Sequence, residues 1–121
     1  MIFGNNSKYC EYDLVRGSDA KVALSVEGYE GTAVELVKSF VRATVTAGGR
    51  SVNIPARQVQ PSSDDTGVFP LDDTSIAITF NTTDLGYGRL EVEAEFNIPD
   101  RDFPDDKKRT ILRGYPGYRI V

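Results

Sequence analysis

The chain has 121 residues, 40% of them hydrophobic and 26% charged, with a formal net charge of −4 at pH 7. This length predicts one domain, residues 1–121, with one core. A mildly acidic chain gains no counterion release on DNA or RNA, so nucleic acid is not an expected partner. No apolar run reaches the roughly 18 residues of a membrane-spanning helix, and the start shows no secretory signal. We therefore expect a protein that is made in the cytoplasm and has no membrane partner.

The side chains available for catalysis are few. The chain has no histidine, so no imidazole is present to activate a serine or cysteine nucleophile or to bind a metal. The one cysteine, Cys10, permits no internal disulfide and is interpreted as filling a small strand position. Paired carboxylates remain possible, but no pair of acids stands out.

The first half of the chain consists of short apolar alternations between turn-forming residues, which is typical of strands. Residues 32–37 are interpreted as a short bridging segment. Gly48-Gly49 predicts a tight hairpin turn, because glycine tolerates the positive φ that such turns need. Pro55 is expected to end the strand that follows. The strands predicted in this half are 9–15, 21–26, 38–46 and 50–54.

The second half begins with a polar loop over 58–74, interrupted by the apolar islands Val68-Phe69 and Leu71. Strands are predicted over 75–81 and from 88 onward, and a last one over 110–121. Gly114-Tyr115-Pro116-Gly117 interrupts the last strand, and Pro116 predicts a bulge or an edge position there. The residues expected to face inward are Ile76, Ile78, Phe80, Leu90, Val92, Ala94 and Phe96. Those expected to face outward are Glu91, Glu93, Glu95 and Asn97.

About seven short strands with little helix predict an all-β sandwich, with a small barrel as the alternative. The acidic turn from Asp100 to Asp106 lacks the ligand pattern of an EF-hand, and Lys107, Lys108 and Arg109 follow at once. We therefore expect a solvated, salt-bridged turn and no metal or other cofactor. Asp72-Asp73 is interpreted as a structural turn before a strand, and the same question arises for Asp64-Asp65. The Asn81-Thr82-Thr83 match to a glycosylation site is attributed to chance.

The C-terminal segment is the richest candidate for a contact surface. Tyrosine and arginine are enriched at interface hot spots, because they bury a large area and keep a polar group. The predicted partner-contact residues are Arg113, Tyr115, Tyr118 and Arg119.

The order of segments resembles the immunoglobulin-like N-terminal domain of baseplate and fibre proteins of tailed phages, especially those of gut anaerobes. The motifs that carry the resemblance are Tyr12-Asp13-Leu14-Val15-Arg16-Gly17-Ser18-Asp19 with the strand after it, Asp84-Leu85-Gly86-Tyr87-Gly88-Arg89-Leu90, and Phe96-Asn97-Ile98-Pro99-Asp100-Arg101-Asp102-Phe103-Pro104-Asp105. Asp106 departs from the pattern, because glycine is usual there. The resemblance implies an immunoglobulin-like antiparallel β-sandwich in a virion structural protein of the fibre, baseplate or capsid.

We therefore expect a non-enzymatic virion protein that is particle-bound or a homo-oligomer and binds other virion proteins. One alternative is a carbohydrate-binding module that uses exposed tyrosines, namely Tyr29, Tyr87, Tyr115 and Tyr118. A small hydrolase that uses two carboxylates is the other. A flat row of exposed tyrosines would favour sugar binding, whereas tyrosines buried against a second chain would favour assembly.

Overall fold

The computed structural model describes residues 2–3, 12–27, 32, 34–59 and 68–121. In these ranges the chain forms eleven strands and one short 3-10 helix. The elements are β1 (Ile2–Phe3), β2 (Tyr12–Leu14), β3 (Asp19–Ser25), β4 (Phe40–Ala47), β5 (Arg50–Gln58), β6 (Val68–Asp72), β7 (Ser75–Asn81), β8 (Gly88–Arg89), β9 (Glu91–Pro99), η2 (Pro104–Asp106), β10 (Lys107–Gly114) and β11 (Tyr118–Ile120).

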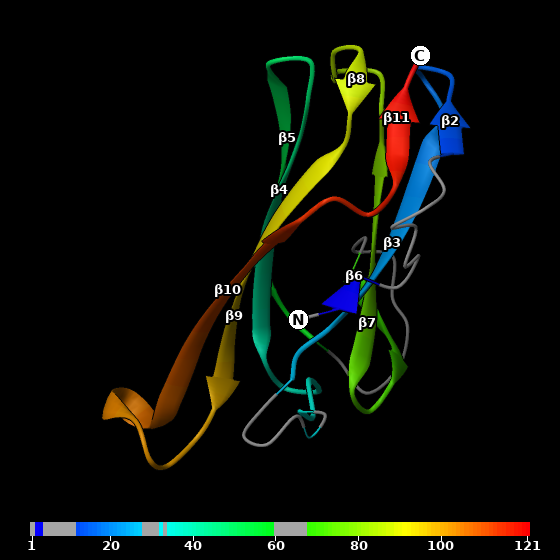
Figure 1. Ribbon diagram of the computed structural model, residues 1–121. Coiled ribbons are helices and arrows are strands. Elements are labelled where there is room, and N and C mark those ends of the chain that lie inside the picture. Colours follow the sequence, from blue (N-terminus) through cyan, green and yellow to red (C-terminus); the bar gives the residue numbers. More distant parts are fainter. Residues whose placement is uncertain (1, 4–11, 28–31, 33, 60–67) are drawn as a thin grey trace.

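The strands form an all-β sandwich, as predicted (Figure 1). One layer is the four-stranded sheet β10-β9-β4-β5, and the facing layer contains the sheet β1-β3-β7-β6. A third sheet, β2-β11-β8, lies at the end of the molecule where the chain terminates, away from η2. The expectation of about seven strands, all antiparallel, differs from this in two respects. The strand count is larger because several strands have only two or three residues, and β2 pairs with β11 in parallel.

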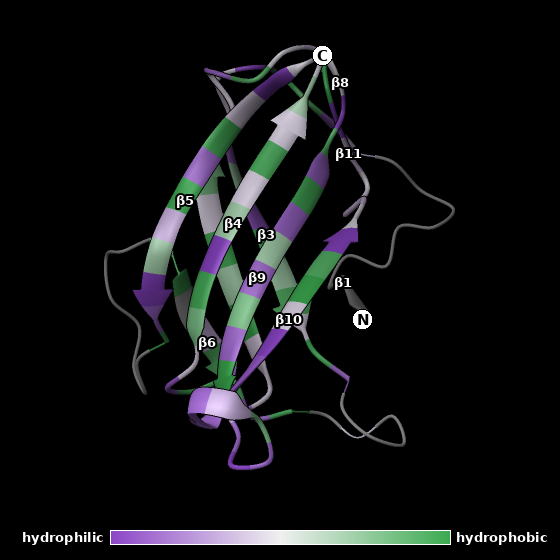
Figure 2. Cartoon of the chain, turned by 90° about the vertical axis from the view of Figure 1, so that its left-hand side faces the viewer, coloured by the Kyte–Doolittle hydropathy of each residue, from purple (hydrophilic) through white to green (hydrophobic). Residues whose placement is uncertain are grey.

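The core lies between the layers and is built from alternate residues of each strand. Figure 2 shows hydrophobic and hydrophilic residues alternating along β4, β5, β9 and β10. The predicted inward row is fully buried, since Leu90 directly before β9 and Val92, Ala94 and Phe96 within it each have 0% exposure. Ile76, Ile78 and Phe80 of β7 face the same core. The predicted register of both strands is therefore confirmed, and the predicted bounds of β7 agree with the structure.

The hairpin between β4 and β5 turns at Gly48-Gly49, as predicted, with φ of 57° and 79°. The prediction that Pro55 ends β5 is wrong, because the strand continues to Gln58. Val41 pairs with Arg57 and Ala43 with Ile54, so Pro55 and Ala56 lie in a β-bulge. β5 is an edge strand, where a residue without an N–H is tolerated.

Two further predictions need correction. The apolar islands of the presumed loop belong to β6, which pairs with β7, and residues 60–67 lie outside the described ranges. The presumed single strand over 110–121 is two strands in different sheets, β10 and β11. The Gly114-Tyr115-Pro116-Gly117 segment carries the chain from one sheet to the other. Of the first predicted strand only Tyr12–Leu14 is strand in the described part, since residues 9–11 lie outside it.

Candidate interaction surface

The outer face of β9 carries glutamates that are all close to arginines of the neighbouring strands. Arg42 of β4 donates from Nε to Glu95 Oε2 at 2.7 Å, and Arg109 of β10 donates from Nε to Glu95 Oε1 at 2.8 Å. Arg113 donates from Nη2 to Glu93 Oε2 at 2.6 Å and lies 4.0 Å from Glu91. The acidic row is therefore one part of a charge ladder, which we define as Glu91, Glu93, Glu95, Arg42, Arg109 and Arg113.

This ladder keeps Glu95 ionised. The hydrogen bond from Arg42 lowers the pKa of Glu95 below its ordinary 4.5, and the positive charge of Arg109 adds to the shift. The partial burial of the carboxylate opposes the shift without reversing it. A general acid in carbohydrate hydrolysis needs a raised pKa, so Glu95 is unsuited to that role.

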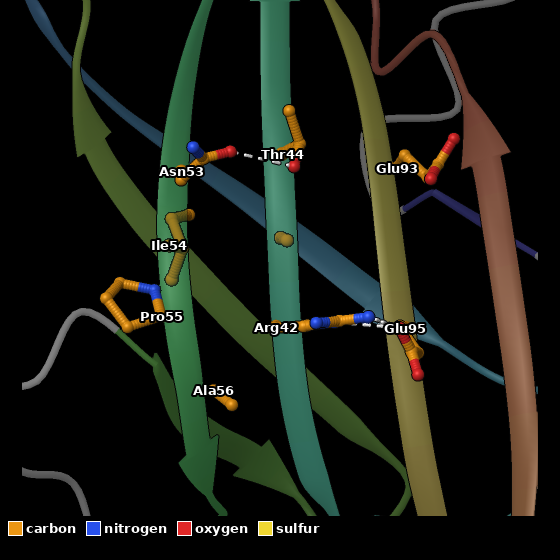
Figure 3. A pocket seen from close by; sticks show the side chains of 9 residues that line it. Arg42, Thr44, Asn53, Ile54, Pro55, Ala56, Glu93 and Glu95 are labelled. Carbon is orange, nitrogen blue, oxygen red and sulfur yellow. Dashed lines mark hydrogen bonds and ion pairs between the residues drawn. The ribbon is translucent and has the colours of Figure 1, made fainter.

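A shallow depression of about 440 Å³ lies beside the ladder, over β4, β5 and β9 (Figure 3). Its wall includes the bulge residues Pro55 and Ala56 of β5. Thr44 Oγ1 donates to Asn53 Oδ1 at 3.0 Å across its upper part, and the Arg42–Glu95 pair crosses its lower part. Four of the polar side chains that line this depression, Thr44, Asn53, Arg42 and Glu95, are thus engaged with one another.

The acidic turn after β9 is held by its own backbone and side chains. Asp100 N donates to Asp106 O at 2.9 Å, and Asp100 Oδ1 accepts from Asp102 N at 3.0 Å. Lys108 lies 5.7 Å from the centre of the Phe103 ring. Within the described ranges no three or more Asp, Glu, Cys or His side chains are grouped so as to hold a metal ion.

The other acidic turn and the glycosylation pattern also have structural partners. Asp72 Oδ1 accepts from Thr74 N at 2.8 Å, which forms the predicted turn before β7. That bond is the first cause of the lowered pKa of Asp72. The Asn81 side-chain amide donates to Gly17 O and Asp19 Oδ1, each at 2.9 Å. Asp64-Asp65, Tyr29 and Cys10 lie outside the described ranges.

Exposed aromatic and arginine side chains gather on the small sheet β2-β11-β8 and on the segments next to its strands. Arg119 of β11 pairs with Asp13 of β2 and with Arg89 of β8, so these three residues lie on one face. The backbone pairing of β2 with β11 continues to Val15 and Val121. Arg16 N donates to Val121 O at 3.0 Å, and Val121 N donates to Leu14 O at 2.8 Å. Five of the nine exposed large hydrophobic residues in the described chain lie on this sheet or next to its strands, namely Tyr12, Val15, Tyr87, Tyr115 and Val121. We call Asp13, Val15, Arg16, Tyr87, Arg89, Tyr115, Arg119 and Val121 the aromatic end.

Arginines lie over both exposed tyrosines of the aromatic end. The Arg89 guanidinium is 4.3 Å from the centre of the Tyr115 ring, and that of Arg16 is 5.1 Å from the centre of the Tyr87 ring. Such pairs hold two long side chains in defined positions while leaving much of both rings exposed. Tyr87 is 62% exposed and Tyr115 is 51% exposed. Arg119 makes an ion pair with Asp13 at 3.0 Å.

The backbone beneath this surface is fixed by a buried threonine. Thr82 has 0% exposure, and its Oγ1 accepts from Gly17 N at 2.9 Å and donates to Ser18 O at 2.8 Å. These bonds join the turn before β3 to the end of β7. The turn also carries Arg16, so Thr82 sets the position from which Arg16 reaches Tyr87.

Two glycines allow the segment before β8 to contact the β4–β5 hairpin directly. Gly86 N donates to Ala47 O at 2.9 Å. A Cβ at Gly86 would lie 2.6 Å from Gly48 O, and a Cβ at Gly48 would lie 2.5 Å from Tyr87 O. Since all of these contacts are to backbone atoms, no side chain can move to make room. This contact fixes the backbone of Tyr87.

The structure brings two of the four predicted contact residues onto the aromatic end. Tyr115 and Arg119 lie there, joined through Arg89. Arg113 instead binds Glu93 in the charge ladder. Tyr118 is half-buried, packs against the core, and donates from its hydroxyl to Lys21 O at 3.4 Å.

The sequence interpretation missed Arg16, Tyr87 and Arg89 as neighbours of the C-terminal segment. The sequence offered a signal for two of the three, Tyr87 and Arg16. Tyr87 stands between two glycines, where a large side chain has no strand partner to cover it. Arg16 directly precedes a turn glycine, Gly17, whose φ is 103°.

No protein-family model matches the chain, and no curated protein matches it significantly. The described ranges include no helix that is long and apolar enough to cross a bilayer.

Proposed function

We propose that the chain is a non-enzymatic virion structural protein of a tailed phage. In this proposal it is an immunoglobulin-like module that joins fibre, baseplate or capsid components through the aromatic end. The observation that carries a contact function is the gathering of exposed tyrosine, valine and arginine on one small sheet, over a backbone held by Thr82 and by the Gly48–Gly86 contact. Assignment to a virion rests on the sequence resemblance, with which the sandwich architecture is compatible.

A preorganised surface supports binding because little conformational entropy remains to be lost. The tyrosines of the aromatic end have stacked arginines, and the turns beneath them are tied by buried hydrogen bonds. Aromatic and arginine side chains are also the residue types that dominate interface hot spots. In the proposed assembly these side chains are buried against another virion protein or another copy of the chain.

The test is co-assembly with the neighbouring virion proteins, or sedimentation of the isolated chain, for the variant Tyr115→Ala with Arg119→Ala. Both side chains are exposed, so the fold should persist, and assembly should weaken by at least about 2 kcal/mol if either is a hot spot. Phe103→Ala with Arg101→Ala is the matched control, because it removes an exposed ring and an arginine from the turn after β9. Equal assembly of both variants and the unmodified chain would remove the aromatic end from the proposal.

A carbohydrate-binding module is the second candidate, favoured by the exposure of Tyr87 and Tyr115. The arginines over both rings oppose it, since each lies over one of the two aromatic faces on which a sugar could stack. Calorimetric titration with polysaccharides of the host surface separates the two. Saturable binding that Tyr115→Ala abolishes, with co-assembly unchanged, would favour the glycan function.

A further inference from the structure

The edges of the two four-stranded sheets differ in whether a further strand can pair with them. β5 has Pro55 and a bulge, and β6 contains Pro70 and a register shift before Asp72. In the described ranges β1 consists of two residues. β10 by contrast pairs with β9 over eight consecutive residues without a shift, and it contains no proline. Among the described strands it is the longest unbroken edge of these sheets.

Among the described residues no strand pairs with the outer side of β10, and a regular edge of this kind leaves backbone groups available. Alternate residues of an edge strand direct their N–H and C=O groups away from the sheet, where an extended segment can accept and donate hydrogen bonds. Figure 2 shows β10 at the margin of the sheet, beyond β9. Adding a strand to such an edge is a common mode of peptide recognition.

The charges of β10 select between possible occupants. Its sequence, Lys-Lys-Arg-Thr-Ile-Leu-Arg-Gly, contains four cations and no acid, although the whole chain has a net charge of −4. The outward row of β10 is Lys107, Arg109, Ile111 and Arg113, according to the pairing with β9. Two antiparallel copies of β10 would place like charges near one another, which destabilises strand pairs. The edge therefore disfavours a second copy of itself and favours an acidic strand.

β9 shows what kind of strand fits this row. It carries glutamate at positions 91, 93 and 95, and Arg109 and Arg113 turn toward it to bind Glu95 and Glu93. The two arginine side chains are nevertheless 61% and 67% exposed, so each keeps most of its surface in solvent while it binds β9. Ile111 lies between them and is 51% exposed.

We propose that β10 is a docking edge that accepts an extended acidic segment of another protein as an added strand. Acidic side chains at alternate positions of this segment would lie beside Lys107, Arg109 and Arg113, and its backbone would continue the sheet. This site lies on β10, whereas the aromatic end lies on and beside β2, β11 and β8. Either proposal can therefore be disproved without affecting the other.

The test is a titration of the ¹⁵N-labelled chain with an acetylated octapeptide in which glutamate and threonine alternate. We expect saturable shifts of the β10 amides, and slower hydrogen exchange at alternate β10 residues. Lys107→Glu with Ile111→Glu lowers the net charge of the outward row from +3 to 0 without removing either arginine, and it should weaken binding at least tenfold. Ala56→Glu with Arg57→Glu changes the net charge by the same −3 on the β5 edge, and it should leave binding within twofold.

Three results would overturn the proposal. One is an absence of saturable shifts at millimolar peptide. Another is equal binding of a peptide with lysine in place of glutamate, which would show that charge does not select the occupant. The third is self-association through β10 without peptide, which would make a second copy the occupant. Both double variants change only exposed residues, so their amide spectra should show a folded chain before peptide is added.

Discussion

On the outer face of the sheet β10-β9-β4-β5, arginines bind glutamates, whereas at the aromatic end arginines lie over tyrosine rings. In the charge ladder, Arg42, Arg109 and Arg113 bind carboxylates of β9, so each of these arginines already has an acidic partner. At the aromatic end, Arg16 and Arg89 lie over rings that remain more than half exposed. An ion pair leaves little to gain from further burial, whereas an exposed ring still has apolar area to remove from water. The aromatic end is therefore the better docking surface of the two, despite its smaller sheet.

The largest effect is expected from breaking the support of the aromatic end. In Gly86→Ala the new Cβ would lie 2.6 Å from Gly48 O and 2.9 Å from Gly48 Cα, so backbone must move. Overpacking of this kind costs about 1–3 kcal/mol or more, and we expect about 3 kcal/mol because no flexible side chain can yield. The measurement is the free energy of unfolding in denaturant. The charge ladder should persist in the native state, while partner binding through Tyr87 should weaken.

Gly49→Ala is the control for this variant. Gly49 also has a positive φ, 79°, but nothing lies within 4 Å of a Cβ built there. Gly49→Ala should therefore lower the free energy of unfolding by only about 1–2 kcal/mol, the cost of left-handed backbone for a residue with a Cβ, without loss of partner binding. A similar loss of stability in both variants would show that the Gly48–Gly86 contact is not the cause.

The charge ladder is expected to contribute less, and in a pH-dependent way. Because Glu95 has a lower pKa folded than unfolded, its contribution is complete above the ordinary 4.5 and is lost as the pH falls through the folded value. Glu95→Gln should cost about 1 kcal/mol at pH 7, the scale of partly exposed ion pairs and charged hydrogen bonds. The difference between the variant and the unmodified chain should shrink in acid, as measured by denaturation from pH 7 to pH 3.

An ion pair at the aromatic end provides the comparison. Arg119 and Asp13 are 52% and 54% exposed, so solvent screens their attraction. Asp13→Asn should change the free energy of unfolding by about half a kcal/mol or less. If Asp13→Asn cost as much as Glu95→Gln, the contrast between a ladder on the sheet and an open pair at the aromatic end would be wrong.

Alternation within one strand was sufficient to predict β7 and the two faces of β9, because the side-chain period of a strand is two whatever its neighbours are. The same rule could not locate the crossover at Gly114-Tyr115-Pro116-Gly117. The apolar pattern on either side of it is alike whether the flanking strands belong to one sheet or to two. Pro55 was misread for a related reason, since only the edge position of β5 makes a proline acceptable within the strand.

The candidate surface was partly predictable. Tyrosine and arginine composition indicated Tyr115 and Arg119, which do lie on the aromatic end. Arg16 and Arg89 reach the tyrosines through contacts between segments far apart in sequence, and those contacts depend on strand pairing. The charge ladder was missed likewise, because three isolated arginines give no sign of the register that brings them to β9.

The two ends of the sandwich also differ in how they adopt left-handed backbone, and this leads to a predicted effect of the opposite sign, a gain in stability. At the aromatic end Gly17 and Gly49 have positive φ, whereas at the opposite turn Asp105 and Asp106 have φ of 58° and 55°. Left-handed backbone destabilises the folded state by about 1–2 kcal/mol when the residue has a Cβ. Glycine removes this cost, but its greater loss of conformational entropy on folding destabilises the folded state by about 0.5–1 kcal/mol. Asp106→Gly should therefore stabilise the chain by about 0.5–1 kcal/mol, seen as a higher denaturation midpoint with an unchanged slope. Asp102→Gly is the control: Asp102 has no positive φ, so the substitution should not stabilise the chain. A loss of stability in Asp106→Gly would mean that the Asp106 side chain contributes more to the turn than its strained backbone costs.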